Sequence, residues 1–129
     1  MKLAKRVLII ENDIDVAELL LEVLKSQFEE MTIDLCYDGQ SGWDRIALAA
    51  TQLQPYDIVL SDWNMPGLSG LEVLKKLRLD STMTSVRFMM VTGQSERLQI
   101  IQAIKAGANA YVTKPLESAI LIQKIADLY

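Results

Sequence analysis

Short, mostly apolar runs alternate along the chain with amphipathic segments. The runs predict strands at residues 7–10, 32–36, 58–60, 88–91 and 110–112. Most are continuous rather than alternating, which is typical of strands buried on both faces of a sheet. In the segments that follow each run, apolar residues recur every three or four positions, which predicts a helix. We therefore expect five strands and five helices in strict alternation.

Turn and capping residues set the expected limits of the helices. The first helix is expected from Ile14 to Phe28, with Asp13 or Asp15 capping its first turn. Gly107 is expected to stop the fourth helix. The apolar positions that indicate the second to fifth helices are Trp43, Ile46, Ala47 and Ala50; Leu71, Val73, Leu74 and Leu77; Leu98, Ile101 and Ile104; and Leu116, Ile120, Leu121 and Ile125.

Strict alternation of strands and helices predicts a doubly wound α/β fold. Each pair of parallel strands needs a right-handed crossover, which places helices on both faces of a parallel sheet. Ligands of such sheets bind beyond the carboxyl ends of the strands. Residues with chemical roles are therefore expected immediately after each apolar run.

Polar residues occur at these positions. Glu11, Asn12 and Asp13 follow the first strand, Asp62 the third, Thr92 the fourth and Lys114 the fifth. Clustered acidic groups repel each other, and a hard divalent cation with oxygen ligands relieves the repulsion. Mg²⁺ fits best, because it is commonly held by one or two carboxylates together with phosphate oxygens.

The same cluster suits phosphoryl transfer. The Asp62 carboxylate can attack phosphorus and form an acyl phosphate. Lys114 offers a cation and Thr92 a hydroxyl donor for the phosphoryl oxygens. Each residue also has a simpler explanation: Asp62 as a turn former, Lys114 in a surface ion pair, and Thr92 as the end of a strand.

Composition narrows the possible functions. The 129 residues, half of them apolar, match one globular domain. The net charge of −4 gives no basic field for nucleic acid or anionic lipid, so we expect neither as a partner. The single cysteine excludes an internal disulfide, and no window approaches the roughly 20 apolar residues that span a bilayer. A cytoplasmic location is expected.

Several segments resemble CheY-like receiver domains of bacterial response regulators, and the resemblance covers nearly the whole chain. These segments are residues 7–13, residues 57–67 together with Gly70, residues 91–93, and the stretch from residue 106 to Lys114-Pro115. The resemblance implies a flavodoxin-like sheet with strand order 2-1-3-4-5, and one receiver domain over residues 1–129.

The resemblance also implies roles for individual residues. Asp62 would be the phosphoacceptor, Thr92 the switch hydroxyl, Lys114 the phosphate-pairing lysine and Tyr111 an aromatic whose rotamer changes on activation. Mg²⁺ would be held by Glu11, Asn12, Asp62 and the backbone carbonyl of Asn64. In the family the Lys-Pro bond is cis.

The partners implied are those of a two-component phosphorelay. A sensor histidine kinase or phosphotransfer protein would donate the phosphoryl group. A downstream protein would bind the face formed by the fourth helix, fifth strand and fifth helix. The chain would be a monomer or a phosphorylation-dependent dimer. It would not be an enzyme beyond assisting its own phosphoryl transfer and autodephosphorylation.

Asn12 departs from the family pattern. It stands where receiver domains usually carry a metal-ligating Asp, and an amide oxygen brings no negative charge. Weaker Mg²⁺ binding is expected, and a pseudo-receiver that no longer takes phosphate remains an alternative. A second alternative is an aspartyl-phosphate phosphatase, although Asn64 stands where those enzymes commonly carry a second Asp.

Overall fold

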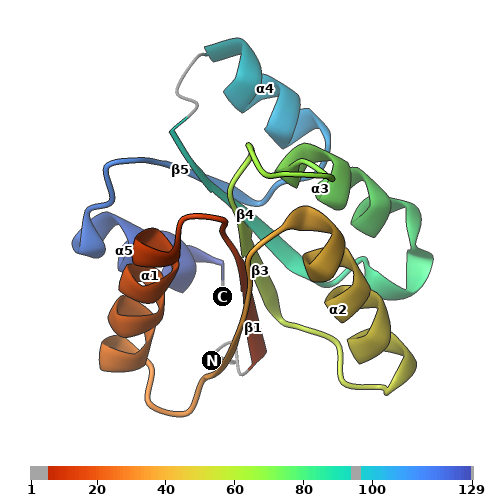
Figure 1. The fold of residues 1–129 in the computed structure, drawn as a ribbon, viewed down its shortest axis with the longest axis horizontal. Coiled ribbons are helices and arrows are strands. Elements are labelled where there is room, and N and C mark those ends of the chain that lie inside the picture. The colour runs from red at the N-terminus through yellow and green to blue at the C-terminus, as the bar shows by residue number, and fades with distance from the viewer. Residues whose placement is uncertain (1–5, 94–96, 129) are drawn as a thin grey trace.

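The computed structural model describes residues 6–93 and 97–128 and shows a five-stranded parallel sheet between two layers of helices (Figure 1). The strands are β1 (Arg6–Ile10), β2 (Thr32–Cys36), β3 (Ile58–Ser61), β4 (Arg87–Thr92) and β5 (Ala110–Thr113). The helices are α1 (Ile14–Gln27), α2 (Gly39–Thr51), α3 (Gly70–Leu79), α4 (Arg97–Lys105) and α5 (Ser118–Asp127), with a short 3₁₀ helix, η1, at Ser81–Met83.

The strand order is β2-β1-β3-β4-β5, with every neighbouring pair parallel. The predicted doubly wound α/β class and the order 2-1-3-4-5 are therefore confirmed. The strands β1, β3, β4 and β5 end at a common edge of the sheet. Their last residues are paired there, Ile10 with Ser61 and Thr92 with Thr113. The residues that follow these strands consequently start from the same side of the sheet.

Each face of the sheet has its own apolar core. Leu8, Ile10 and Met90 point towards α2 and α3, where they join one cluster of buried side chains. Ile9 and Met89 point to the opposite face and join the cluster under α1 and α5. Successive residues of a strand point to opposite faces, so continuous apolar runs are required here.

Side-chain caps define the starts of three α-helices. The Asp13 carboxylate accepts hydrogen bonds from the backbone N–H groups of Asp15 and Val16, so Asp13 is the cap of α1. Asp38 caps α2 in the same way. Ser69 and Glu72 form a reciprocal capping box at α3.

The predicted limits of two helices were wrong by one or two residues, and four strands are longer than predicted by one residue at one or both ends. The first helix ends at Gln27, and Phe28 is its C-terminal cap. The last helix begins at Ser118, so Leu116 lies before it, because the backbone of Glu117 is extended at φ −111° and ψ 119°. The short helix η1 was not predicted.

Arg78 joins the end of α3 to the turn between α4 and β5. Its Nε donates to the carbonyl of Gly107 at 3.1 Å, its Nη1 to the carbonyl of Val86 at 2.8 Å and its Nη2 to the side chain of Asn109 at 2.9 Å. Gly107 has a φ of +108°, and a β-carbon there would lie 2.9 Å from the Arg78 side chain. Arg78 therefore fixes the point where the chain enters β5.

Replacing Arg78 by Met tests this anchoring. The change keeps an apolar stem but removes every donor, which leaves the Gly107 and Val86 carbonyls without this partner. We expect the free energy of unfolding in urea to fall by about 2 to 3 kcal/mol. Lys75→Met, on the exposed side of α3, is the matched control and should change it by less than about 0.5 kcal/mol. Equal losses in the two variants would contradict the anchoring role.

Candidate functional site

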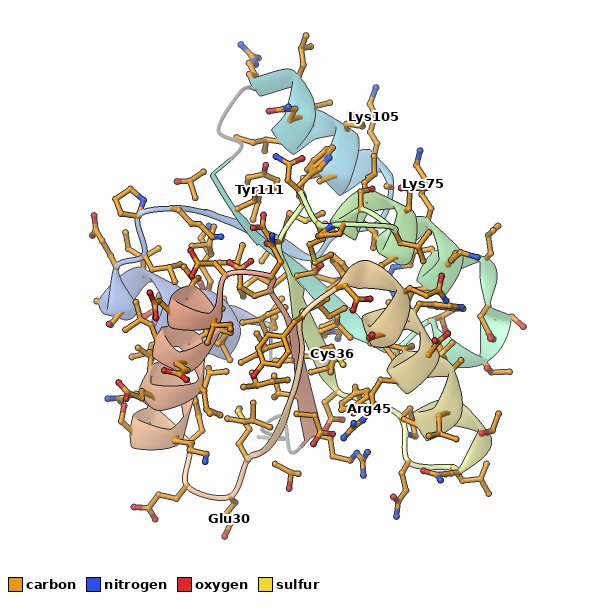
Figure 2. The ribbon with its side chains drawn as sticks, in the orientation of Figure 1. Glu30, Cys36, Arg45, Lys75, Lys105 and Tyr111 are labelled. Atoms are coloured by element: carbon orange, nitrogen blue, oxygen red, sulfur yellow. The ribbon has the colours of Figure 1, made fainter. Side chains whose placement is uncertain are left out.

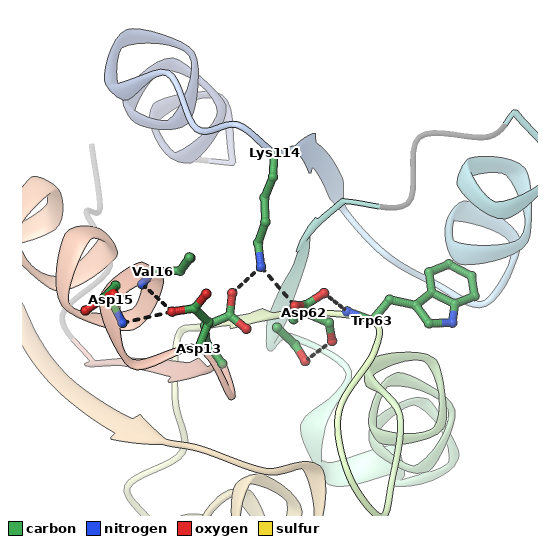
Figure 3. Close-up of polar contacts among 8 residues, drawn as sticks. Asp13, Asp15, Val16, Asp62, Trp63 and Lys114 are labelled. Carbon is green, nitrogen blue, oxygen red and sulfur yellow. Dashed lines mark hydrogen bonds and ion pairs between the residues drawn. The ribbon is translucent and has the colours of Figure 1, made fainter.

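Three charged side chains meet at the carboxyl ends of β1, β3 and β5. The Lys114 ammonium donates to Asp62 Oδ2 at 2.9 Å and also to Glu11 Oε1 (Figure 3). Backbone hydrogen bonds that continue the sheet hold all three residues. Glu11 N–H donates to the Cys36 carbonyl at 3.0 Å, Asp62 N–H to the Ile10 carbonyl at 3.0 Å and Lys114 N–H to the Thr92 carbonyl at 2.9 Å. The sheet therefore positions the cluster directly.

The Asp62 carboxylate has different partners on its two oxygens. Its Oδ1 accepts a hydrogen bond from the backbone N–H of Trp63 at 2.6 Å, whereas its Oδ2 faces Lys114. The Thr92 side chain also forms a hydrogen bond with Asp62, and both residues are buried. Asp62, Thr92 and Lys114, which were predicted from separate strand ends, thus lie together.

Two residues that support Asp62 were not given roles from the sequence. The Ser61 hydroxyl donates to the Asp62 backbone carbonyl at 2.9 Å. Gly70 packs against the same carbonyl, and a β-carbon at Gly70 would lie 2.0 Å from that oxygen. A glycine in the first turn of a helix was a possible signal, because glycine lowers helix stability. No comparable signal marks Ser61.

Folding shifts the pKa values of Glu11 and Asp62 in opposite directions. For Glu11, burial raises the pKa, as does its hydrogen bond with Asp62, and Lys114 only partly opposes this. For Asp62, burial would raise the pKa, but hydrogen bonds from Lys114, Thr92 and Glu11 outweigh it and hold the pKa below its usual range. For Lys114, burial lowers the pKa, but the two carboxylates outweigh this and raise it. Asp62 is the carboxylate that stays ionised most readily.

The charges of the cluster fit a bound cation. Two carboxylates against one ammonium leave one negative charge, and the buried Oε2 of Glu11 has no hydrogen-bond partner among the described residues. Within residues 6–93 and 97–128, no group of three His, Cys, Asp or Glu side chains could hold a metal. A metal here would therefore depend on two carboxylates and neutral oxygens, which suits Mg²⁺ with its retained waters.

The remaining predicted site residues lie around this centre. Asn12 and Asn64 are exposed at its rim, and the neighbouring Trp63 is partly exposed. Tyr111 is half-buried on β5, where burial, and after it the charge of Asp62, raises the pKa of its phenol. Asp13 serves the cap of α1. The Lys114–Pro115 bond is cis, as the family resemblance implied.

Comparison with known families identifies the domain. The model of the response regulator receiver domain matches residues 7–126, almost the entire chain. The chain belongs to this family. Receiver domains act in signalling rather than as metabolic enzymes, generally bind Mg²⁺, and interact with kinases and downstream targets.

Individual relatives are chemotaxis proteins. The chain is 37% identical over 83 residues to the chemotaxis protein CheY-3 of Vibrio cholerae, an alignment that covers 64% of each protein. It is 39% identical over 74 residues to CheY of Pseudomonas aeruginosa, covering 57% of this chain and 60% of that protein. The aligned segments thus span less than two thirds of these relatives.

Solved structures confirm the fold. The CheX-CheY-BeF₃-Mg²⁺ complex of Borrelia burgdorferi contains a chain that matches with a TM-score of 0.85 at 22% identity, over 98% of this chain and 90% of that one. The phosphorylated cyanobacterial phytochrome response regulator RcpA matches with a TM-score of 0.82 at 20% identity, over 96% and 90%. In the part of this receiver domain that the structure describes, no helix has the length and apolar character needed to cross a membrane.

The opposite pKa shifts of the acidic pair predict an unusual pH dependence for Glu11→Gln. Because the folded state raises the pKa of Glu11, the wild type loses stability as pH rises from the ordinary value of 4.5 through that raised pKa. Glutamine cannot ionise, so the stability of the variant relative to wild type should increase with pH across this window and then level off. Urea unfolding in EDTA at a series of pH values measures it. A relative stability that falls with rising pH would contradict the predicted direction.

Proposed function

We propose that this receiver domain is a phosphorylation-dependent switch in which Asp62 accepts a phosphoryl group from a phosphohistidine. The donor would be a sensor histidine kinase or a phosphotransfer protein. The observation that carries the proposal is the buried Asp62 carboxylate with Lys114 on one oxygen and Thr92 beside it. Its lowered pKa keeps the nucleophile ionised at neutral pH.

The two oxygens of Asp62 suit different tasks. Oδ1 is fixed by the Trp63 N–H, while Oδ2 faces Lys114 and is the better placed nucleophile. Attack by Oδ2 forms an O–P bond as the P–N bond to the donor histidine breaks, and the imidazole nitrogen keeps the electron pair. Lys114 then pairs with a phosphoryl oxygen in place of the carboxylate, and Thr92 donates its hydroxyl to another.

Glu11, Asn12, Asp62 and the backbone carbonyl of Asn64 would hold Mg²⁺. When bound, Mg²⁺ would supply positive charge against the phosphoryl oxygens. The surplus negative charge and the unpartnered Glu11 oxygen support this assignment. The raised pKa of Glu11 means that a proton competes with the metal, so affinity should increase with pH.

The output surface would be the face formed by α4, β5 and α5. A cavity of about 400 Å³ lies there, lined in part by Ile100, Tyr111, Ile120 and Lys124. A change at Thr92 would reach this face through β4 and β5, which are paired at Thr92 and Thr113. Under this proposal a downstream protein reads the rearranged face, and the domain works in the cytoplasm as a monomer or a phosphorylation-dependent dimer.

The pseudo-receiver is the second candidate, and the observation in its favour is Asn12. Loss of one ligand charge weakens the metal site, whereas Asp62, Thr92 and Lys114 are all present and in contact. The phosphatase alternative is not favoured, because Asn64 cannot act as an acid or base. Turnover of a small phosphate ester would distinguish that enzyme from a receiver.

Acetyl phosphate tests the phosphoacceptor. With Mg²⁺ present, the intact protein should gain the mass of one phosphoryl group, and Asp62→Asn should abolish the gain because an amide is a poor nucleophile. Asp13→Asn is the matched control, since it changes the same functional group at the cap of α1 and should still be labelled. An unmodified wild type would support the pseudo-receiver, and labelling of Asp62→Asn would exclude Asp62 as the acceptor.

Restoring an acid at position 12 tests the metal site. Asn12→Asp should tighten Mg²⁺ binding by about tenfold, which corresponds to ~1.4 kcal/mol, because it adds a negative charge beside Glu11 and Asp62. Trp63 fluorescence during a Mg²⁺ titration measures the affinity. Gln40→Glu, in the first turn of α2, adds the same charge away from the metal ligands and should have a much smaller effect. An unchanged or weaker affinity in Asn12→Asp would place position 12 outside the metal site.

A further inference from the structure

A second cluster of charged side chains lies at the other end of the sheet from Asp62. Arg6 begins β1, Tyr56 precedes β3 and Arg45 projects from α2. Asp34 lies in the middle of β2. Figure 2 shows Arg45 at the opposite end of the molecule from Tyr111, which lies near the output face.

Asp34 is fully engaged by its neighbours. The Tyr56 hydroxyl donates to Asp34 Oδ2 at 2.5 Å, and the Arg45 Nη2 lies 3.2 Å from Asp34 Oδ1. Each oxygen of this carboxylate therefore has a partner. One carboxylate cannot neutralise two guanidinium groups, and Arg6 is the second.

Arg6 is held in place with part of its donor capacity unused. Its guanidinium lies over the Tyr56 ring, 5.2 Å from the ring centre, and its Nη1 donates to the Gln54 side chain at 3.2 Å. Its Nε is buried and has no hydrogen-bond partner in the described part of the chain. Asp57 accepts from the backbone N–H of Arg6 at 2.9 Å. A buried donor without an acceptor is unfavourable, so the Arg6 guanidinium is not fully satisfied by the groups around it.

The two arginines line a common cavity. Arg6, Asp34, Arg45, Gln52 and Tyr56 form part of the wall of a space of about 210 Å³. The charged side chains on this wall give one surplus positive charge, in a chain whose net charge is −4. The volume is below the roughly 300 to 1,000 Å³ of sites for drug-sized ligands. It suits a charged group of a few atoms rather than a large molecule.

We propose that this cavity binds an oxyanion, the phosphate or carboxylate group of a ligand, between Arg6 and Arg45. Guanidinium groups match such anions with paired N–H donors, and the Gln52 amide can add another donor. Stacking of Arg6 on the buried Tyr56 ring, together with the Tyr56 hydrogen bond to Asp34, preorganises the wall of the cavity. An anion here would link β1 to α2 and stabilise the folded domain by mass action.

Nuclear magnetic resonance of the full chain in EDTA tests the proposal. Inorganic phosphate and acetate are titrated separately at pH 7.5, with sodium chloride at matched ionic strength as the reference. We expect saturable shifts of the Arg6 and Arg45 Nε–H signals with at least one oxyanion, and no matching shift of the Trp63 indole signal at the phosphoacceptor site. Saturation by phosphate alone would identify a phosphate ligand, and saturation by acetate alone a carboxylate.

Matched variants separate binding from a purely internal ion-pair network. Arg45→Gln should weaken oxyanion binding about tenfold or more, because it removes the charged fork. This variant should fold, since the Arg45 side chain is 47% exposed. Lys75→Gln removes the same charge from the exposed side of α3 and should bind as the wild type does. Labelling of Arg45→Gln by acetyl phosphate should be unchanged, so this test is independent of the phosphoacceptor assignment.

Three results would overturn the proposal. The first is shifts that rise linearly without saturation, and the second is chloride producing the same shifts as the oxyanions. The third is equal affinity in Arg45→Gln and the wild type. Any of them would leave the cluster as a network that only holds β2 and α2 together.

Discussion

The Lys114 ammonium lies between two buried carboxylates, and the chemistry of the domain depends on this contact. One cation cannot neutralise both Glu11 and Asp62, so the cluster keeps a negative charge in a place where water is scarce. In the folded chain the pKa of Glu11 is raised and that of Asp62 is lowered. A protonated or metal-bound Glu11 beside an ionised Asp62 is the arrangement that satisfies all three groups.

The contact exists because the sheet is parallel. Strands β1, β3 and β5 all end at the same edge, and their carboxyl ends bring residues 52 and 103 positions apart in sequence within reach of Lys114. Glu11, Asp62 and Lys114 each follow a strand that is covered by apolar side chains on both faces of the sheet. Stability and reactivity therefore have a common origin, because the packing that excludes water also places the charges.

The sequence predicted those site residues whose positions depend only on where the strands end. Glu11, Asp62, Thr92 and Lys114 were found because each follows an apolar run, and strand order followed from the family resemblance. The two supports of Asp62 were missed for different reasons. Gly70 packs on the Asp62 carbonyl only because the loop after β3 folds back. The Ser61 hydroxyl bonds to the same carbonyl through a side-chain orientation that the apolar pattern does not give.

The cluster around Asp34 was missed for a similar reason. The pattern of apolar residues marks β2 and α2, but it does not give the rotation of α2 that brings Arg45 to Asp34. Likewise, both Asp13 and Asp15 can cap a helix, and only the backbone geometry selects Asp13. Periodicity defines elements, whereas side-chain pairing between them depends on register and rotation.

The close packing of Gly70 on the Asp62 carbonyl limits how the backbone of Asp62 can move. On the α3 side there is no room even for a methyl group, so the backbone of Asp62 cannot move that way without displacing the helix. The start of α3 and the Asp62 backbone are therefore coupled mechanically, because a displacement of either one towards the other must be shared by both.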